Sequence, residues 1–523
     1  MTITVVPQPH EVVETGHGFV LDGSTAIVAA AGAEAIAHTL QVRLRPSTEL
    51  PLPLVTPGEA ATGSIRLGLD AALPPSGYRL TVAADGADLR GGDAAGLFHA
   101  TQTLLQLLPA AVFRLAPLPG TRWELPGVRI TDHPRFAWRG MLLDCSRHFF
   151  GKDAIRRLID VLALHRFNVL HLHLTDDQGW RLEIPRYPRL TEVGPWRARS
   201  AMVDTAELAP GEPVPYDSAP HDGFLTREDA QELVAYALER FITIVPEIDL
   251  PGHSQGAIAA YPELGNGGEP LEVWTDWGIS PHVLNVSDAT IAFYRGVLDE
   301  VMSVFPGEYV HIGGDECPKD EWRASPAAQD RMRSLGLADE DALQSWLIGG
   351  FADYLSAHGR RPVGWDEILE GGLPAGTTVM SWRGVDSGIA AVEAGHDVVM
   401  TPESDTYLCR RQSDDPGSEP LGAVPPLPLR TVYEYEPMPA GLSDAAQGHV
   451  LGAQCQMWTE FVSSERQMHQ MAFPRASAFA EAVWCEQRTP YEDFLLRLEA
   501  HRARLHALGV DAWRPPGSST VTG

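Results

Sequence analysis

Cysteine is scarce in this chain, and other marks of large protein classes are missing as well. The 523 residues include five cysteines, widely spaced and without a CxxC pair, which argues against a zinc ribbon and against a disulfide-stapled scaffold. No apolar run approaches the roughly 20 residues that a membrane-spanning helix needs. The N-terminus, MTITVVPQPHEVVETG, has no basic start followed by an apolar stretch. We therefore expect no membrane partner and a cytoplasmic protein, or a secreted one if a signal peptide was removed.

Positive charge is also in short supply. Lys and Arg number 40 against 69 Asp and Glu, which gives a formal net charge of −29. A field of that sign repels phosphate backbones and anionic lipid surfaces, so we expect no nucleic-acid partner. Hydrophobic residues make up 44% of the chain and charged residues 21%, a globular balance with enough apolar material for a large core. Nothing in the composition indicates an oligomeric state.

The first part of the chain, residues 1–131, has the pattern of a small α+β domain. Runs typical of strands occur at Thr2–Val6, Ile65–Leu69 and Tyr78–Val82, and a helical pattern covers Ala94–Leu108. This region holds no cluster of side chains suited to catalysis. We therefore predict that it supports the domain that follows.

From residue 132 to residue 523, short β-rich runs alternate with amphipathic helical stretches, which is typical of a parallel sheet with helical crossovers. Thr226 is the expected N-cap of one of these helices. The alternation predicts an α/β fold, a (β/α)₈ TIM barrel with C-terminal helices. A doubly wound sheet is the alternative, but no Gly-rich dinucleotide turn follows the first strands. The expected strands are Met141–Asp144, Val169–Leu174, Ile242–Ile248, Tyr309–Ile312, Pro362–Trp365, Thr378–Trp382, Val398–Thr401 and Leu451–Trp458.

Acids, Arg, His and Trp recur where these expected strands end. The carboxyl ends of barrel strands form the active site in enzymes of this fold. A single charged strand end is usually a solvated side chain or a helix cap, whereas so many together favour a polar cavity with aromatic walls. Sugars suit such a cavity, because their hydroxyls bind acids and Arg and their C–H faces stack on Trp. The Trp residues considered for the wall are Trp346, Trp365, Trp382 and Trp458.

The adjacent acids Asp315 and Glu316 are the strongest catalytic candidates. They follow the strand Tyr309–Ile312 and two glycines, which permit tight turns and close approach of a ligand. Burial and a neighbouring negative charge are expected to raise the pKa of such an acid, as a general acid requires. A retaining glycoside hydrolase usually has two opposed carboxyl groups ~5–5.5 Å apart. Neighbours on one strand end do not easily oppose each other, so the second acid has a role other than direct attack.

Six stretches in register resemble the family 20 glycoside hydrolases, the β-N-acetylhexosaminidases. They are Trp138–Phe149 (WRGMLLDCSRHF), Asn168–Trp180 (NVLHLHLTDDQGW), Pro246–His253 (PEIDLPGH), His311–Glu316 (HIGGDE), Gly364–Glu367 (GWDE) and Gln456–Glu460 (QMWTE). Together they cover the chain from about residue 132 to 500, and the N-terminal region looks like the α+β domain that precedes this barrel in the family.

The resemblance implies a retaining exo-enzyme that removes terminal N-acetylhexosamine from glycans by substrate-assisted catalysis, without a metal or another cofactor. The acetamido oxygen of the substrate would attack its own anomeric carbon and form an oxazolinium ion. Glu316 would protonate the leaving oxygen and then act as base on water. Asp315 would hold the acetamido N–H, and Tyr407 would bind the acetamido carbonyl oxygen. The residues that match sugar-binding or supporting positions are Arg147, Asp176, His253, Trp346, Trp365, Trp458 and Glu460.

One position departs from the family pattern. Where Asp usually follows the Tyr-Leu pair, Cys409 stands, followed by Arg410. A thiol is a weak hydrogen-bond partner, so recognition of the sugar at O4 or O6 is altered. In one branch, the mammalian lysosomal α-subunit, a non-acidic residue followed by Arg goes with acceptance of 6-sulfated N-acetylglucosamine. The hypothesis is that this enzyme accepts or prefers 6-sulfated N-acetylglucosaminides, and the alternative is that Arg410 points to solvent.

Two other functions compete with this interpretation. A metal-dependent barrel hydrolase would use the imidazoles of His171 and His173, with Asp176, His253 and Asp315 as further ligands. The same stretch also reads as a buried strand with satisfied histidines. A catalytically inactive sugar-binding protein is the non-enzymatic alternative, and the presence of both Asp315 and Glu316 argues against it.

Overall fold

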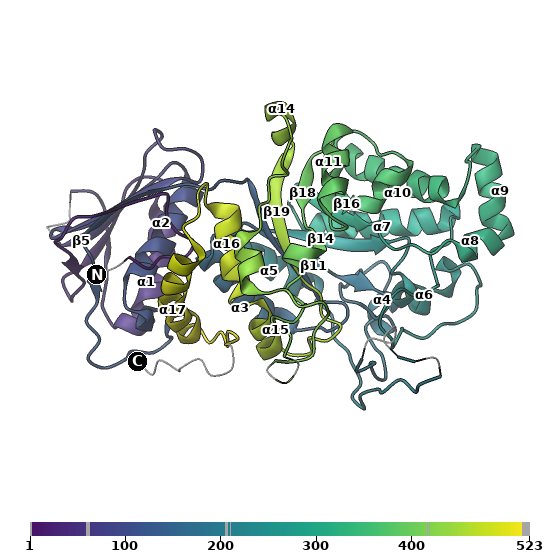
Figure 1. Cartoon of the computed structure of the whole chain (residues 1–523), viewed down its shortest axis with the longest axis horizontal. Coiled ribbons are helices and arrows are strands. Elements are labelled where there is room, and N and C mark those ends of the chain that lie inside the picture. The colour runs from purple at the N-terminus through teal and green to yellow at the C-terminus, as the bar shows by residue number, and fades with distance from the viewer. Residues whose placement is uncertain are drawn as a thin grey trace.

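The computed structural model describes residues 3–58, 63–203, 208–209, 211–415, 417 and 419–514. Figure 1 shows two parts side by side, an N-terminal domain in purple and blue and a larger barrel in teal and green, with the C-terminal helix α17 (Tyr491–Ala507) packed between them. Among the described residues, no helix is both long enough and apolar enough to cross a membrane.

The N-terminal domain contains one seven-stranded sheet in the order β1-β9-β6-β7-β5-β3-β4. Helices α1 and α2 pack on the sheet, and the Asp93 side chain caps α2 by accepting a hydrogen bond from the Gly96 N–H. The elements are β1 (Glu11–Glu14), β2 (Phe19–Val20), β3 (Ala26–Ala29), α1 (Glu34–Thr48), β4 (Leu54–Val55), β5 (Ser64–Leu69), β6 (Tyr78–Ala83), β7 (Gly86–Gly91), α2 (Ala94–Leu107), η1 (Ala110–Phe113), β8 (Glu124–Leu125) and β9 (Val128–Asp132).

The predictions of two strands and the helix in this domain are confirmed by β5, β6 and α2. The strand predicted at Thr2–Val6 is wrong for its described part, because residues 3–6 form no strand; Thr2 lies outside the described residues. Val6 is fully buried, and its backbone exchanges hydrogen bonds with the side-chain amide of Gln106, at 2.9 and 2.7 Å. The apolar run thus marks a buried segment whose polar backbone groups are satisfied by a side chain rather than by a sheet neighbour.

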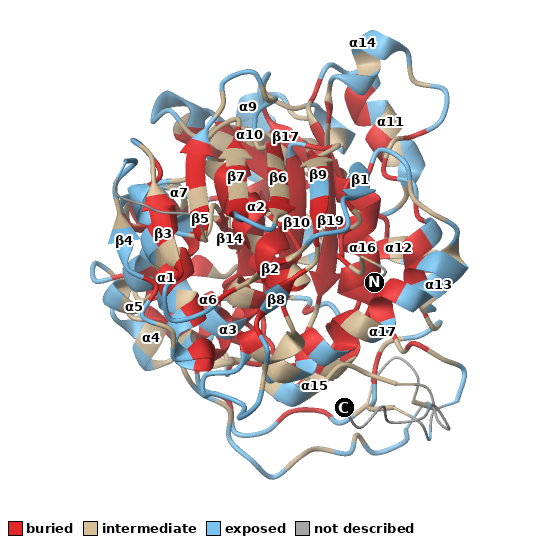
Figure 2. Ribbon diagram, turned by 90° about the vertical axis from the view of Figure 1, so that its left-hand side faces the viewer, coloured by how far each residue is buried: buried red, intermediate tan, exposed pale blue. Residues whose placement is uncertain are grey.

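The second part is a closed barrel of eight strands, each parallel to its neighbours, with β10 paired to β19. All eight predicted strands and the (β/α)₈ fold class are therefore confirmed. Figure 2 shows the barrel strands β10 and β19 buried behind the N-terminal sheet. The strands are β10 (Trp138–Asp144), β11 (Val169–His173), β14 (Thr243–Leu250), β15 (Tyr309–Gly313), β16 (Arg361–Trp365), β17 (Thr378–Ser381), β18 (Val398–Met400) and β19 (Val450–Met457).

The barrel interior below the active-site end is packed with apolar side chains, which is the usual filling of an eight-stranded barrel. The two strands of the short hairpin above β11 are β12 (Thr175–Asp176) and β13 (Gly179–Trp180). The remaining helical elements are α3 (Gly151–Leu164), α4 (Arg189–Glu192), α5 (Arg227–Leu238), α6 (Gln255–Ala260), η3 (Pro262–Leu264), α7 (Asp288–Val304), α8 (Asp320–Ala324), α9 (Pro326–Leu335), α10 (Glu340–Ala357), η4 (Asp366–Gly371), α11 (Val385–Glu393), α12 (Glu403–Thr406), α13 (Leu429–Glu434), α14 (Asp444–Gln447), α15 (Glu465–Ala472) and α16 (Arg475–Trp484).

The predicted N-cap at Thr226 is confirmed. Its hydroxyl accepts a hydrogen bond from the Asp229 N–H at 3.0 Å, and the Asp229 carboxylate accepts one from the Thr226 N–H at 3.2 Å. This reciprocal pair satisfies two of the donors that every helix leaves free at its start. Helix α5 is thereby fixed at its beginning, directly after the connection that leaves the second barrel strand.

The two domains are joined by a buried polar network. The last strand of the N-terminal sheet ends at Asp132, and β10 begins at Trp138. Asp132 accepts hydrogen bonds from Arg166 at 2.8 Å, from the Tyr78 hydroxyl at 2.8 Å and from the Trp484 indole at 3.1 Å. These partners come from β6, from the end of α3 and from α16, so one carboxylate ties together three elements of both domains.

Replacing Arg166 with Ala is expected to lower the free energy of unfolding by about 3–5 kcal/mol, because it leaves the buried Asp132 carboxylate without its cation. The Arg166 side chain has no exposed surface, and that of Asp132 is 1% exposed. Urea denaturation followed by circular dichroism measures the loss. The matched control is Arg323→Ala, which removes a surface pair with Asp320 and is expected to change stability by about 0.5 kcal/mol or less. Equal losses in both variants would contradict a special role for the junction.

Candidate active site

A cavity of about 430 Å³ opens at the carboxyl ends of the barrel strands. Of the residues predicted for the site, all but Asp176, Trp346 and Arg410 line it. The lining residues that the sequence predicted are Arg147, His253, Asp315, Glu316, Trp365, Trp382, Tyr407, Cys409, Trp458 and Glu460; the others are Trp277, Gly278, Ile279, Glu403, Ala423, Val424, Phe461 and Val462. The deep side is polar and aromatic, whereas the segments 277–279, 423–424 and 461–462 make an apolar margin.

Two glycines place the adjacent acids. Gly313 and Gly314 have φ angles of +64° and +100°, a region that favours glycine. A Cβ on Gly313 would lie 1.6 Å from Asp249 Oδ1, and one on Gly314 would lie 2.3 Å from an Ile368 methyl carbon. The chain can therefore make this turn only with glycine at both positions. The groups that approach the two glycines closely are Asp249 and Ile368 of the protein, not a ligand.

The turn at Gly313 and Gly314 places the side chains of Asp315 and Glu316 in different surroundings. The Asp315 side chain is 14% exposed and the Glu316 side chain 35% exposed. Glu316 has a φ of +46° and His253 one of +48°, backbone conformations that cost energy for residues other than glycine and are frequent at functional sites. Glu316 thus reaches toward the opening, whereas Asp315 lies deeper in the cavity.

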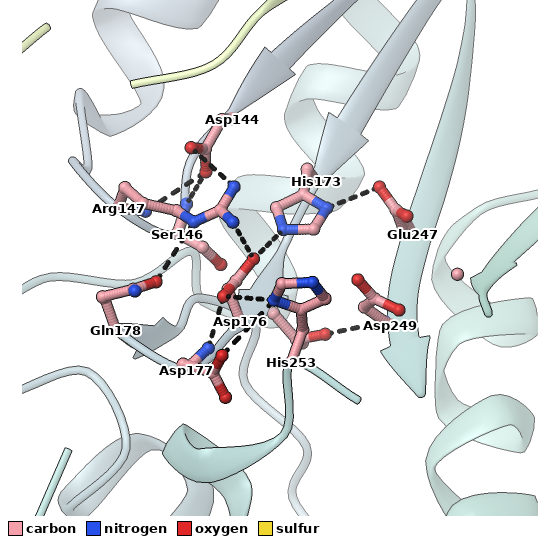
Figure 3. A network of polar contacts seen from close by, with 12 residues as sticks. Asp144, Ser146, Arg147, His173, Asp176, Asp177, Gln178, Glu247, Asp249 and His253 are labelled. Carbon is pink, nitrogen blue, oxygen red and sulfur yellow. Dashed lines mark hydrogen bonds and ion pairs between the residues drawn. The ribbon is translucent and has the colours of Figure 1, made fainter. Parts of the chain in front are cut away.

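His253 links Glu316 to the interior of the barrel, and Figure 3 shows its contacts with Asp176 and Asp177 on the interior side. Its Nε2 lies 3.4 Å from Glu316 Oε2 and 3.8 Å from Asp315 Oδ2, and its Nδ1 lies 3.2 Å from Asp176 Oδ1. Asp176 does not line the cavity. Its carboxylate instead lies behind His253, as expected of a supporting residue.

Arg147 anchors the other side of the same network (Figure 3). Its guanidinium lies 2.8 Å from Asp176 Oδ2 and 3.3 Å from Asp144 Oδ2, and it covers one face of the Trp458 ring at 5.2 Å. These contacts hold the guanidinium at the wall of the cavity that Glu460 also lines.

The pKa values of Asp315 and Glu316 are shifted in opposite directions, whereas the sequence predicted a raised pKa for the catalytic acid. Burial, and then the negative charges of Glu316 and Glu247, raise the pKa of Asp315 to about 6, although His253 acts against them. Burial also acts to raise the pKa of Glu316, but the hydrogen bond and charge of His253, and then Arg147, outweigh it and hold that pKa below its usual value. The expected increase thus falls on Asp315, because His253 lies closer to Glu316.

Asp249 completes the cluster around Asp315. Burial, and then the charge of Asp315, hold the pKa of Asp249 well above its usual value, so this acid is neutral. His253, in contrast, is held protonated: burial alone would lower its pKa, but the charge of Asp176 and its hydrogen bonds with Asp176, Asp177 and Glu316 raise it well above the usual value. Asp315 therefore stands between a neutral acid and a cation, and its Oδ1 is buried without a hydrogen-bond partner among the described residues.

Three tryptophans and one tyrosine wall the deep end of the cavity. Trp365 lies 5.9 Å from Trp458 between ring centroids, and its indole N–H donates to Glu247 at 2.9 Å. Tyr407 stacks against Trp382 at 6.5 Å with an interplanar angle of 21°. Burial holds the pKa of Tyr407 well above its usual value, so its hydroxyl stays a donor.

The prediction that Trp346 belongs to this wall is wrong. Trp346 lies on α10 and faces a separate surface hollow beside α7, with the Arg331 guanidinium 5.5 Å from its ring. The buried face of α10 is formed instead by Leu343, Leu347 and Phe351, and Trp346 lies to one side of that face. Trp382, at the end of β17, occupies the third aromatic position of the wall.

Cys409 lines the cavity, whereas Arg410 does not. The Arg410 guanidinium is almost buried and forms an ion pair with Glu403, and it also donates to the Pro425 carbonyl at 3.2 Å. Arg410 therefore points neither to solvent nor into the cavity. The Glu403 carboxylate, which the sequence did not single out, lines the cavity in its place.

Several neighbours of the site were not among the predicted site residues. Glu247 and Asp249 alternate on β14 and both point inward, a pattern readable from the stretch PEIDLPGH once the strand was recognised. Glu367, next to Trp365 in the GWDE motif, had the same signal. Trp277 and Glu403 had none, because they lie on long connections whose path the sequence pattern does not determine.

Groups with metal-ligating side chains also lie here. His171, Glu247 and His311 form one, and Asp249, His253 and Asp315 another, each with ligand atoms within 4.8 Å of one another. Glu247 already accepts hydrogen bonds from Trp365 at 2.9 Å and from His173 at 2.6 Å. The histidine-rich strand β11 is thus a buried strand whose imidazoles mainly contact carboxylates of the barrel interior.

Known proteins give an independent comparison. Residues 136–487 match the family model described as glycosyl hydrolase family 20, catalytic domain, and residues 2–133 match that of glycosyl hydrolase family 20, domain 2. A beta-hexosaminidase of Porphyromonas gingivalis is 41% identical over 99% of this chain and 66% of its own length. A beta-N-acetylhexosaminidase of Cellulomonas fimi is 32% identical over 99% of this chain and 98% of its own length.

Solved structures agree with these matches. The family 20 beta-N-acetylhexosaminidase of Streptomyces coelicolor superposes with a TM-score of 0.84 at 32% identity, covering 98% of both chains. An exo beta-N-acetylglucosaminidase of Vibrio harveyi, in complex with N-acetylglucosamine, superposes with a TM-score of 0.86 at 34% identity, covering 99% of this chain and 79% of that one. The chain therefore belongs to glycosyl hydrolase family 20, as an enzyme of the beta-N-acetylhexosaminidase type.

Proposed function

We propose that the protein is a retaining exo-β-N-acetylhexosaminidase in which the acetamido group of the substrate is the nucleophile. The observation that carries this proposal is the position of Asp315. Asp315 lines the cavity that Trp365, Trp382 and Trp458 wall, and its carboxylate is only partly paired, because Oδ1 lacks a hydrogen-bond partner among the described residues. A carboxylate that lines an aromatic pocket and that the protein leaves partly unpaired fits the N–H of an acetamido group.

The first chemical step follows from that placement. The acetamido carbonyl oxygen attacks the anomeric carbon of its own sugar while the bond to the leaving oxygen breaks, and Glu316 gives its proton to that oxygen. Asp315 accepts the acetamido N–H and offsets the positive charge of the oxazolinium ion, and Tyr407 donates to the acetamido oxygen. Holding the nucleophile in place in this way supplies part of the rate acceleration.

In the second step Glu316 acts as a base. It takes a proton from water, whose oxygen attacks the anomeric carbon and reopens the oxazolinium ring, so the configuration is retained. Free Glu316 is ionised at neutral pH, because its pKa is held low by His253. Bound substrate covers its exposed carboxylate, and the loss of water favours the protonated form that the first step requires.

A separate part of the proposal concerns the substituent at O6 of the sugar. Acceptance of a 6-sulfate would need a free guanidinium, and Arg410 is paired with Glu403. The carboxylates of Glu403 and Glu460 line the same cavity and would repel a sulfate. We therefore propose that neutral N-acetylhexosaminides are the better substrates, and that a 6-sulfated one is accepted only when the Arg410–Glu403 pair opens.

A panel of aryl β-glycosides tests these points together. We expect turnover of the N-acetylglucosaminide, a kcat/KM lower by roughly three orders of magnitude for the glucoside, which lacks the nucleophile, and a kcat/KM about tenfold lower for the 6-sulfated substrate. Glu403→Gln should narrow the last difference. Comparable rates on the glucoside would refute substrate assistance, and faster cleavage of the sulfated substrate would restore the 6-sulfate hypothesis.

The same assay addresses the two competing functions. Activity is expected to survive exhaustive chelation, and a loss that added metal restores would support the metal-dependent alternative. A folded protein that binds N-acetylglucosamine but turns over no member of the panel would be a sugar-binding protein.

A further inference from the structure

A second pair of adjacent acids lies at the end of β16, next to the pair that ends β15. Asp366 accepts a hydrogen bond from the Arg383 guanidinium at 2.8 Å. Glu367 accepts from the Trp382 indole N–H, at 2.9 Å to one carboxylate oxygen and 3.2 Å to the other. The two consecutive acids thus accept hydrogen bonds from the two consecutive residues that follow β17, the neighbouring strand in the barrel.

The hydrogen bond from Trp382 to Glu367 involves a residue of the cavity wall. Among the described residues, Glu367 is the one hydrogen-bond partner of the indole nitrogen, which is the only polar atom of the Trp382 side chain. Trp382 is half-buried and lines the cavity, where its ring stacks on Tyr407. Glu367 does not line the cavity itself. It therefore contacts the Trp382 indole from outside the cavity lining.

We propose that Glu367 is a positioning residue: its carboxyl group holds the Trp382 ring, and through it Tyr407, in the plane against which the acetamido group turns to attack. This inference rests on the proposed function. A half-buried ring that lost its hydrogen bond could swing about its side-chain torsions, and the wall would lose the geometry that a nucleophile within the substrate requires.

The protonation state of Glu367 is consistent with a positioning role, because a neutral Glu367 adds no negative charge beside Asp315. Burial, and then the negative charge of Asp315, raise the pKa of Glu367 to about 8; Asp366 adds to the rise, while the bond from Trp382 and the charge of Arg383 oppose it. A raised pKa means that the protonated form prevails below about pH 8. Over the pH range in which Asp315 titrates, Glu367 is thus a neutral acceptor for the indole, and Gln reproduces it closely.

The experiment compares Glu367→Ala with Glu367→Gln on an aryl N-acetylglucosaminide from pH 5 to 9, together with inhibition by a thiazoline analogue of the oxazoline. Ala should lower kcat by about 10- to 100-fold and weaken the thiazoline to a similar degree. Gln should keep kcat within about threefold and leave the acid limb of kcat/KM in place. The matched control is Glu370→Ala, which removes an exposed partner of Arg383 and should behave as the wild type.

A second variant covers the case in which Glu367→Ala does not fold. Trp382→Phe keeps an aromatic ring but removes the indole N–H, so it should lower kcat, and adding Glu367→Gln to it should cause no further loss. The proposal is overturned if Glu367→Ala leaves kcat and thiazoline affinity unchanged, if Gln loses as much as Ala, or if Gln shifts the acid limb by more than about half a pH unit. A wild-type protein without turnover on any acetamido substrate would instead refute the proposed function.

Discussion

Glu316→Gln is expected to lower kcat/KM for an unactivated N-acetylhexosaminide by roughly 10²- to 10⁴-fold, the range that loss of a general acid produces. Gln keeps the size of the side chain and the contact with His253, 3.4 Å away in the wild type, but it has no proton of suitable acidity to give. The Asp315 carboxylate and the aromatic wall remain, so the acetamido group can still attack. The variant should therefore fail mainly where the leaving oxygen needs a proton.

The leaving group supplies the discriminating measurement. A dinitrophenyl leaving group departs without protonation, and Glu316→Gln should form the oxazolinium from that substrate at close to the wild-type rate. Initial rates over a series of phenyl leaving groups should show a much steeper dependence on leaving-group pKa than in the wild type. The control is Glu370→Gln, an exposed acid on η4 whose partner is Arg383. An equal loss on every leaving group would show that Glu316 acts in some way other than as the acid.

Asp315→Asn is expected to reduce kcat by roughly 10²- to 10³-fold, the loss seen when one preorganised electrostatic contact to the transition state is removed. The carboxylate would otherwise hold the acetamido N–H and stabilise the positive ring that forms. Affinity for the thiazoline inhibitor should fall in parallel, because that molecule imitates the oxazolinium. Trapping a sugar covalently on the protein, in either variant, would contradict substrate assistance.

The pH profile gives this variant a signature of its own. Asp315 works as the carboxylate, and burial, followed by the charges of Glu316 and Glu247, raises its pKa to about 6. Because the active form is the deprotonated one, kcat/KM of the wild type should fall as the pH drops through about 6. Asn does not titrate, so that limb should disappear in Asp315→Asn. A limb that stays at pH 6 in the variant would belong to another group.

The fold was readable from the sequence to a large extent because its signals are local. Eight short β-rich runs separated by amphipathic helices have few arrangements other than a closed parallel barrel, and each run became a barrel strand. The exception lies near the N-terminus, where Val5 and Val6 are as apolar as a strand but are buried beside Gln106. An apolar run indicates burial, and it does not by itself indicate what satisfies the backbone.

The candidate site was readable where residues follow strands, and less so elsewhere. Asp315, Glu316, Trp365 and Trp458 stand directly at strand ends, so their strands carry them into the cavity. Trp346 was misplaced because it lies on a helix, where one residue more or less rotates a side chain by roughly 100° around the axis. Trp382 follows a strand directly, and it lines the cavity as predicted.

The charges of the site depended on distances that no motif contains. Adjacency suggested a raised pKa for the catalytic acid, but the side chains of Asp315 and Glu316 point into different surroundings. His253, which precedes Asp315 by 62 positions in the chain, lies nearer to Glu316 and lowers the pKa of Glu316. Burial and the charges of Glu316 and Glu247 raise the pKa of Asp315. Electrostatic effects fall off over a few ångströms, so only the folded arrangement sets them.

The Asp315-Glu316 pair, its two glycines and the strand before it were determined by the sequence alone, since a strand, a turn and a pair of acids are consecutive in the chain. Which acid carries the higher pKa, the pairing of Arg410 with Glu403, and the hold of Glu367 on Trp382 were decided by the tertiary structure. The reason is physical: local pattern fixes which residue types stand at a strand end, whereas charge, hydrogen bonding and ring orientation depend on partners brought together from different barrel strands and connections.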